Sequence, residues 1–259
     1  MQIKIIQWNI KINSAPDKIV EFLSRRIIDN TIINLQEVSR NAYEHIIQEI
    51  NCDATYSLNY RSPGKFEGIN RKMGLMTLVN SGEIIKSELV KTSVFPERTL
   101  FSKIKIADVI LNNLTFHSLT GVDYKKAKSS NFASLASFID SHPIDIMTCD
   151  ANEPKVDAIN DEEIVFFDNR DKGKMASLLF GCNKIHNLKD TYKQYSIAHS
   201  QSLEAGYTHI TGNNKKRYDH IYCRSNWKVL SSIVSYYESI NASSDHGLVE
   251  AIVEIENNV

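Results

Sequence analysis

Apolar residues recur along the chain in two patterns, one typical of helices and the other of strands. The segment Asp17–Asp29 carries Ile19, Phe22, Leu23 and Ile27 at helical spacing, which predicts a helix with one apolar face. The same patterns predict helices at Asn41–Ile50 and Lys126–Ser141, and strands at Gln2–Ile10, Asn30–Gln36, Leu75–Asn80, Glu83–Lys91, Leu100–Lys105, Val109–His117, Asp145–Cys149, His220–Arg224, Val229–Tyr237 and Leu248–Ile255. Residues 157–202 mix both patterns and predict no clear order of elements.

The order of these elements indicates the class of fold. Strands in adjacent runs with few helices between them are typical of two mainly antiparallel sheets with helices outside, an α+β protein. The chain has only 5 Pro and 10 Gly, and no repeat, low-complexity tract or linker interrupts it. We therefore expect one domain over residues 1–259.

Composition and charge exclude several classes of protein. With 30 Lys plus Arg against 31 Asp plus Glu, the formal net charge of −1 gives no global attraction for a polyanion, so a local basic surface would have to hold one. The chain carries no run of 18 uncharged apolar residues, and its first residues read as a strand and not as a secretion signal, so no membrane span or export is expected. Four widely separated cysteines with no CxxC pair argue against a disulfide framework or a zinc site and favour the cytoplasm.

Polar residues follow several of the predicted strands at the point where each strand leaves the core. Acidic and amide oxygens of this kind suit a hard cation such as Mg²⁺ or Mn²⁺, and histidines beside them could move protons or bind a phosphoryl group. Each position alone also has a structural interpretation, such as a strand end, a helix cap or an Asx turn. The positions are Trp8-Asn9, Gln36-Glu37, His117, Asp150-Ala151-Asn152, Asp219 and Asp245-His246.

Order and local sequence together make these positions informative. The chain resembles the endonuclease/exonuclease/phosphatase superfamily, which has the fold of deoxyribonuclease I and exonuclease III. No single motif is specific, but six occur in the family's order across nearly the whole chain. They are QWNI (Gln7–Ile10), LQEV (Leu35–Val38), TFHSLTG (Thr115–Gly121), TCDANEP (Thr148–Pro154), RYDHIY (Arg217–Tyr222) and SSDHGLV (Ser243–Val249).

The resemblance implies a four-layer α/β/β/α sandwich with a site at one edge between the two sheets. It also implies hydrolysis of a phosphoester with Mg²⁺ or Mn²⁺ as the cofactor. Carried over by motif, Glu37 would be the principal metal ligand, with Asn9 and Asp245 close by.

The remaining motif residues would act on the phosphate. By the same resemblance, Asp150 would orient or deprotonate the attacking water, and Asn152 would hydrogen-bond the scissile phosphate. His246, oriented by Asp219, would contact the phosphate or act as a base. His117 would face the phosphate from the other side and protonate or stabilise the leaving oxygen. An acid behind a histidine fixes its tautomer and stabilises the imidazolium, which supports the Asp219–His246 pairing on physical grounds.

The chain departs from the family pattern at two positions. Cys149 stands where the family has Gly, and Ala151 stands where it has an aromatic residue. Cys149 is either a small buried residue or a redox-sensitive thiol. The acid that pairs with His117 is not identified by any motif, and Glu67 and Glu97 are the candidates.

The substrate is indicated only by basic clusters with nearby aromatic residues. These suggest contacts to a nucleic acid, DNA or RNA, although a solvated basic face is the alternative. The other hypotheses are a phosphatase or phosphodiesterase for a phospholipid, inositol phosphate or nucleotide, a tyrosyl-DNA phosphodiesterase-like enzyme, and an inactive binding module. The clusters span Arg61–Lys72, Lys125–Lys128 and Lys215–Arg217, and the candidate substrate-binding residues are Arg71, Arg98, Lys215, Lys216 and Arg217.

Overall fold

The computed structural model describes residues 1–61, 72–121 and 125–255, whose strands form two six-stranded sheets and one two-stranded ribbon. Each large sheet contains one parallel pair, β1–β2 or β7–β8, and its other pairs are antiparallel. This confirms the expected pair of mainly antiparallel sheets. In spatial order, the first sheet is β13 (Lys228–Ser235), β14 (Leu248–Glu254), β1 (Gln2–Asn9), β2 (Thr31–Val38), β4 (Gly74–Asn80) and β3 (Asp53–Tyr56). The second sheet is β5 (Glu83–Leu89), β6 (Thr99–Ile106), β7 (Val109–His117), β8 (Ile146–Asp150), β12 (Asp219–Arg224) and β9 (Leu188–Asp190), and the ribbon is β10 (His209–Thr211) with β11 (Asn214–Lys216).

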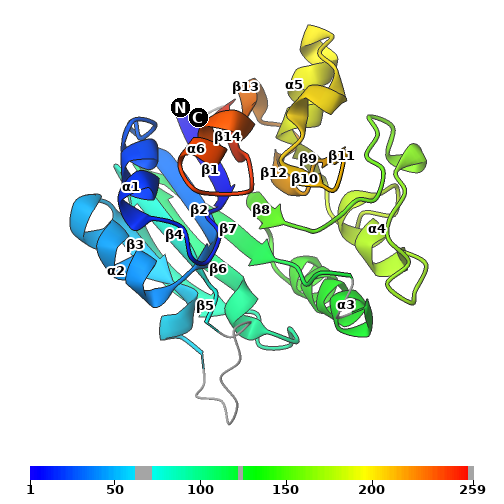
Figure 1. Cartoon of the computed structure of the whole chain (residues 1–259), viewed down its shortest axis with the longest axis horizontal. Helices are drawn as coiled ribbons and strands as arrows, with labels where there is room; N and C mark the ends of the chain where they lie inside the picture. Colours follow the sequence, from blue (N-terminus) through cyan, green and yellow to red (C-terminus); the bar gives the residue numbers. More distant parts are fainter. Residues whose placement is uncertain (62–71, 122–124, 256–259) are drawn as a thin grey trace.

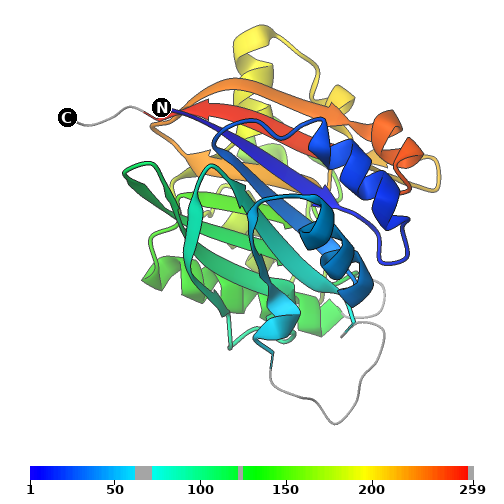
Figure 2. The ribbon, with the colours of Figure 1, turned by 90° about the vertical axis from the view of Figure 1, so that its left-hand side faces the viewer.

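Helices cover the outer faces of the two sheets (Figure 1). Helices α1 (Pro16–Ser24) and α2 (Arg40–Glu49) pack on the first sheet, and α3 (Lys125–Ser141) and α4 (Lys174–Phe180) pack on the second. Figure 2 shows α1 and α2 lying across the first sheet, with the second sheet behind it. The layers confirm the α/β/β/α sandwich. The remaining helical segments are α5 (Thr191–His199), α6 (Tyr236–Asn241) and the 3₁₀ turns Ser57–Asn59, Pro96–Arg98, Asp161–Glu163 and Leu203–Gly206.

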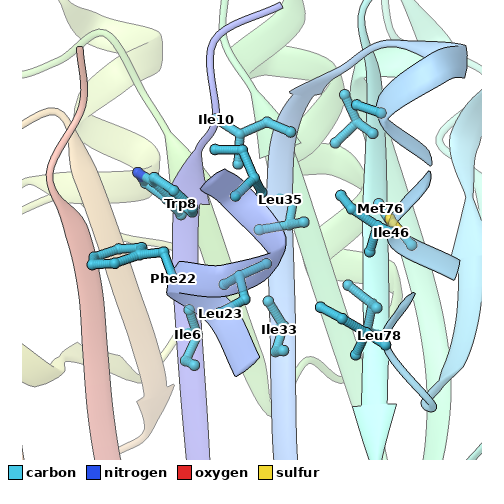
Figure 3. Packing of buried hydrophobic residues seen from close by; sticks show 14 of the residues in the cluster. Ile6, Trp8, Ile10, Phe22, Leu23, Ile33, Leu35, Ile46, Met76 and Leu78 are labelled. Carbon is cyan, nitrogen blue, oxygen red and sulfur yellow. The ribbon is translucent and has the colours of Figure 1, made fainter. Parts of the chain in front are cut away.

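Helix α1 shows how the apolar pattern acts locally. Pro16 begins the helix, where its missing N–H costs nothing. Phe22 and Leu23 point into the first sheet, and the Phe22 ring lies 5.0 Å from that of Trp8 (Figure 3). The helix ends five residues before the predicted Asp29, because the hydroxyl of Thr31 both accepts from the amide and donates to the carbonyl of Ile28 and so forms a turn.

Other boundaries differ where short or non-local elements compete with the pattern. The predicted strand Val229–Tyr237 stops at Ser235, and α6 follows, with Ser239 donating to the Ser235 carbonyl. The edge strand β3 was not predicted, because four residues are too few to give a periodic signal. Residues 157–202, for which the sequence predicted no clear order of elements, contain α4, β9 and α5.

The layer between the two sheets changes from apolar to polar along the strands. In β1, Ile3 and Ile5 join the apolar cluster between the sheets, and Gln7 and Asn9 follow on the same face because successive side chains alternate. Strand β7 repeats the order with Leu111, then Asn113 and Thr115, then His117. The polar end of this layer is therefore the place where chemistry can occur.

The helices and the cysteines of the described residues bear on the expectations of no membrane span and no disulfide framework. None of their helices combines the length and apolarity needed to cross a membrane. All four cysteines are free thiols, and Cys149 is fully buried, which favours its interpretation as a small core residue.

Candidate active site

Five strands, β1, β2, β7, β8 and β12, bring polar residues to one edge of the sandwich. Asn9, His117 and Asp150 are the last residues of β1, β7 and β8. Asp219 begins β12 and lies directly opposite Asp150, because β8 and β12 are antiparallel. The ends of parallel strands, and the start of an antiparallel neighbour, share one edge of a sheet. The two sheets thus each contribute half of the site.

Glu37 reaches the site because of a β-bulge near the end of β2. Strict alternation would turn Glu37 outward with Leu35, toward α1 and α2. Instead the register with β4 shifts between Leu35 and Val38, and Glu37 has a left-handed φ of 56°. One oxygen of Glu37 accepts from the Asn9 side-chain amide at 3.2 Å, and the other accepts from the backbone amide of Ile12 at 3.1 Å.

Asp150 lies at the centre of the cluster. Its Oδ2 accepts from the Asn9 side-chain amide at 2.9 Å, and its Oδ1 accepts from the backbone amide of Asn152 at 3.0 Å. The Nε2 atoms of His117 and His246 lie 3.4 and 3.8 Å from Oδ2. Burial raises the pKa of Asp150 to about 7, with the charge of His246 opposing this rise. This carboxyl is therefore poised to exchange a proton near neutral pH.

Asp219 and His246 form the expected acid–histidine pair. His246 Nδ1 lies 2.8 Å from Asp219 Oδ2, and both side chains are buried. Burial opposes protonation of His246, but the charges of Asp219 and Asp150 outweigh it and raise the pKa of His246 to about 10. His246 is therefore a cation at neutral pH, with its Nε2 directed toward Asp150.

His117 has the opposite electrostatic character. Burial, the charge of Arg98 and the charge of His246 all lower the pKa of His117 well below its ordinary value. Its Nε2 is near Asp150, and Glu37 lies at 3.8 Å. Of the proposed acid partners, Glu67 lies outside the described residues and Glu97 is buried in the turn Pro96–Arg98. One cationic and one neutral histidine therefore face the carboxyl group of Asp150.

The loop after β8 holds Asn152 in place. Asn152 has a left-handed φ of 48°, and its side-chain amide donates to the Ser118 carbonyl at 3.2 Å. Lys128 Nζ donates to the Asn152 carbonyl at 2.7 Å and pairs with Glu153 at 2.9 Å, and neither Lys128 nor Glu153 is exposed. The sequence indicated Lys128 only as part of a basic cluster, so this supporting ion pair is a finding of the structure.

Asp245 is the expected metal-site residue that stands apart. Its side chain is 47% exposed, and its carboxylate pairs with Lys11 Nζ at 3.2 Å. The three groups whose ligand atoms lie within 4.8 Å of one another are Asp150, Asp219 and His246, among the residues that the structure describes.

The chemistry of the donors favours a different set for a cation. A metal on His246 would have to displace the proton that Asp219 stabilises, so that pair is better suited to proton chemistry. Glu37 and Asp150 offer carboxylate oxygens that share the single amide of Asn9, and Glu37 is 20% exposed at the rim. These oxygen donors fit a hard cation such as Mg²⁺ or Mn²⁺, whose charge would relieve the repulsion between the two acids.

The predicted substrate-binding residues fall into different environments. Arg71 lies outside the described residues. Arg98 is buried, and its charge acts on His117. Arg217 is also buried, and its charge is compensated within the protein by Asp157 and Asp190.

Lys215 and Lys216 lie beside a hollow next to the site. The hollow has a volume of about 460 Å³ and is also lined by Lys155 and Tyr207. Lys215 Nζ lies 4.4 Å from the centre of the Tyr207 ring, and Lys216 donates to the Lys155 carbonyl. The hollow adjoins the site because Thr208, next to Tyr207, accepts from the amide of Gly247.

Sequence reasoning missed two further residues at the site. The His209 ring lies beside that of His246, tilted by 35° with ring centres 4.5 Å apart, and the Gln7 side-chain amide donates to Asp219 at 3.1 Å. His209 lies in the ribbon, which the sequence did not predict. Gln7 did carry a signal, because it is polar at a position of β1 whose alternation partners Ile3 and Ile5 are apolar.

Comparison with known proteins bears on the fold. No protein-family model and no curated protein matches the chain by sequence. Solved structures do match: humanized D. rerio TDP2 at 14% identity over 98% of this chain and 99% of that chain, with a TM-score of 0.71. An endonuclease/exonuclease/phosphatase from Bacteroides vulgatus matches at 15% identity over 99% and 100%, with a TM-score of 0.69. The human Nocturnin catalytic domain with bound sulfate matches at 14% identity over 98% and 94%, with a TM-score of 0.66. The chain therefore has the fold of the endonuclease/exonuclease/phosphatase proteins, as its motifs predicted.

Proposed function

We propose that this protein is a Mg²⁺- or Mn²⁺-dependent hydrolase of phosphodiester bonds, with nucleic acid as its substrate. The observation that carries the proposal is the position of Asp150 between a cationic His246 and a neutral His117, with Glu37 beside them. Groups whose environments push their pKa values apart are those that divide acid and base roles in catalysis.

The side chains divide the work of hydrolysis as follows. Glu37, with Asn9 beside it, would hold the divalent cation, which would supply charge neutralisation at the phosphate and a more acidic water. Asp150, with a pKa raised toward neutrality, takes the proton of the attacking water. His246 presents a charged N–H to a phosphoryl oxygen, since the raised pKa of its imidazole favours phosphate contact over a role as base. His117 donates a neutral hydrogen bond to the leaving oxygen.

Two observations support nucleic acid as the substrate. The hollow beside the site combines Lys155, Lys215 and Lys216 with the ring of Tyr207, which matches a phosphate chain with stacked bases. One similar structure, D. rerio TDP2 complexed with a single-strand DNA product, matches at 14% identity over 98% of this chain and 99% of that chain, with a TM-score of 0.70.

A substrate panel tests the reaction and the substrate together. Plasmid DNA, single-stranded DNA, RNA, a 5′-tyrosyl oligonucleotide, inositol phosphates and sphingomyelin are each incubated with Mg²⁺, with EDTA, and with EDTA followed by excess Mg²⁺. We expect cleavage of a nucleic acid that EDTA abolishes, that Mg²⁺ restores, and that weakens as salt is raised. Cleavage unchanged by EDTA would refute the metal dependence. Turnover of only a lipid or inositol phosphate, insensitive to salt, would refute the nucleic-acid assignment.

Glu37→Gln tests the position of the cation. The substitution removes one negative charge without changing the shape of the side chain, so we expect turnover at low Mg²⁺ to fall by about 100-fold or more. Partial recovery at high Mg²⁺ would follow from the remaining oxygen donors. Glu49→Gln, an exposed acid at the end of α2, is the matched control and keeps wild-type turnover. Equal turnover of the two variants at low Mg²⁺ would show that Glu37 does not hold the metal.

A further inference from the structure

Gln7 is a fully buried amide whose side chain bridges the two sheets. It lies in β1 on the face toward the second sheet, between the apolar Ile5 and the site residue Asn9. Its Nε2 donates to Asp219 Oδ1 at 3.1 Å, across the space between the sheets. We propose that Gln7 is a positioning residue, which holds the carboxylate of Asp219, and through it His246, in the orientation that catalysis needs.

The hydrogen bonds of Asp219 show why this contact matters. Asp219 has no exposed surface, so each of its oxygens needs a partner within the protein. Asp219 Oδ2 is hydrogen-bonded to His246 Nδ1 at 2.8 Å, and Asp219 Oδ1 accepts from the side-chain amide of Gln7. A carboxylate held at one oxygen alone can rotate about its last bond, whereas two donors on opposite oxygens fix its plane. The imidazole of His246 then has a fixed acceptor to align with.

The orientation of Gln7 is itself fixed by Gln36. The two amides exchange hydrogen bonds, each Nε2 donating to the other Oε1 at 2.6 Å. Gln36 also donates to the Thr115 hydroxyl at 3.1 Å. Gln7 therefore has its carbonyl oxygen committed to Gln36, and its amide nitrogen faces Asp219.

A second amide pair in the same layer provides a matched reference. Asn34 and Asn113 exchange two hydrogen bonds of 3.0 Å between the same two sheets, and both are fully buried. Asn34 also accepts from the Thr77 hydroxyl, and no hydrogen bond among the described residues joins Asn34 or Asn113 to Asp219. Loss of either pair leaves a buried amide without its partner, but only loss of Gln7 frees Asp219.

Gln7→Met and Asn113→Leu, each close in size to the residue it replaces, separate positioning from general stability. We expect both variants to lose resistance to urea, because Asn113→Leu leaves the Asn34 amide unpaired and Gln7→Met leaves both the Gln36 amide and Asp219 Oδ1 unpaired. We expect Gln7→Met to lower kcat by about 10- to 100-fold with little change in KM, as substitution of a group behind a reacting residue does. Asn113→Leu keeps a near wild-type kcat. Adding Gln7→Met to Asp219→Asn has little further effect, because the group that Gln7 positions has already been altered.

A readout that does not need turnover completes the test, because the inference rests on the proposed function. The ¹⁵N resonances of the His246 ring report the hydrogen bond to Asp219 whether or not a substrate is known. We expect these resonances to move in Gln7→Met and to stay in place in Asn113→Leu. Equal loss of kcat in both variants, or an unmoved His246 signal in Gln7→Met, would overturn the positioning role. Failure of the wild-type protein in the substrate panel, with the His246 signal still dependent on Gln7, would overturn the proposed function alone.

Discussion

Asp219→Asn removes a buried charge that stabilises the protonated form of His246. The rise in the pKa of His246 from 6.5 to about 10 corresponds to about 5 kcal/mol of preferential stabilisation of the imidazolium, at about 1.4 kcal/mol for each pKa unit. Asp219 is the largest of the raising influences, ahead of Asp150. Because Asp219→Asn removes the largest of these influences, we expect kcat/KM to fall by about 10²- to 10⁴-fold, the range that positioned acid–base groups supply.

The assay compares Asp219→Asn, His246→Ala and the double variant on one oligonucleotide. Since Asp219 acts through His246, we expect the double variant to lose little more than the worse single variant. His220→Ala is the control. His220 is also buried, but it faces the other side of β12, where Nδ1 lies 3.2 Å from Asp190. We expect the folded His220→Ala protein to keep its turnover. Multiplicative losses in the double variant would refute the coupling, and a collapse in the control would mean that His246 is the wrong histidine.

Two further predictions concern stability, measured by urea unfolding. Lys128→Met and Glu153→Gln each leave one member of a buried ion pair without its partner, so we expect each variant to lower the free energy of unfolding by about 3–5 kcal/mol. Replacing both residues by apolar ones should restore part of this stability. A double variant no more stable than the single variants would contradict the reasoning. Burial opposes ionisation of Asp157 and Asp190, but the charges of Arg217, Lys193 and His220 together outweigh it and hold the pKa of both carboxyl groups below the usual value. The stability that these two carboxylates contribute is therefore complete above about pH 4 and is lost as the pH falls further. We expect Asp157→Asn to lower the free energy of unfolding at pH 7 and to make that free energy less sensitive to acid. Parallel plots of unfolding free energy against pH for wild type and variant would contradict this.

The sequence predicted the site because strand ends are local features. A polar residue after an apolar run marks the edge of a sheet, and the six motifs identified Asn9, Glu37, His117, Asp150 and His246 without knowledge of how the sheets meet. The family resemblance implied the pairing of Asp219 with His246, and His246 Nδ1 lies 2.8 Å from Asp219 Oδ2. The fold class followed from the same strand order.

Contacts between distant parts of the chain could not be predicted in this way. Arg217 reads as a surface cation until Asp157 and Asp190, 60 and 27 positions away, are brought around it. The bulge that turns Glu37 inward depends on its pairing with β4. The role of Lys128 depends on the loop that follows another strand. Local periodicity carries none of this information.

The two amide pairs between the sheets have a consequence for how the halves of the molecule are aligned. Apolar surfaces attract without direction, so two sheets joined only by isoleucine and valine could slide past each other at small cost. The Gln7–Gln36 pair lies within the first sheet and reaches the second through Thr115 and Asp219, while the Asn34–Asn113 pair crosses directly. Hydrogen bonds, unlike apolar contacts, favour one relative position of the groups that they join, because a hydrogen bond lengthened by about 1 Å is lost. A version of this protein with hydrophobic residues at Gln7 and Gln36 would gain resistance to unfolding and lose the alignment of Asp219 with His246, so selection for stability and selection for turnover would pull these two positions in opposite directions.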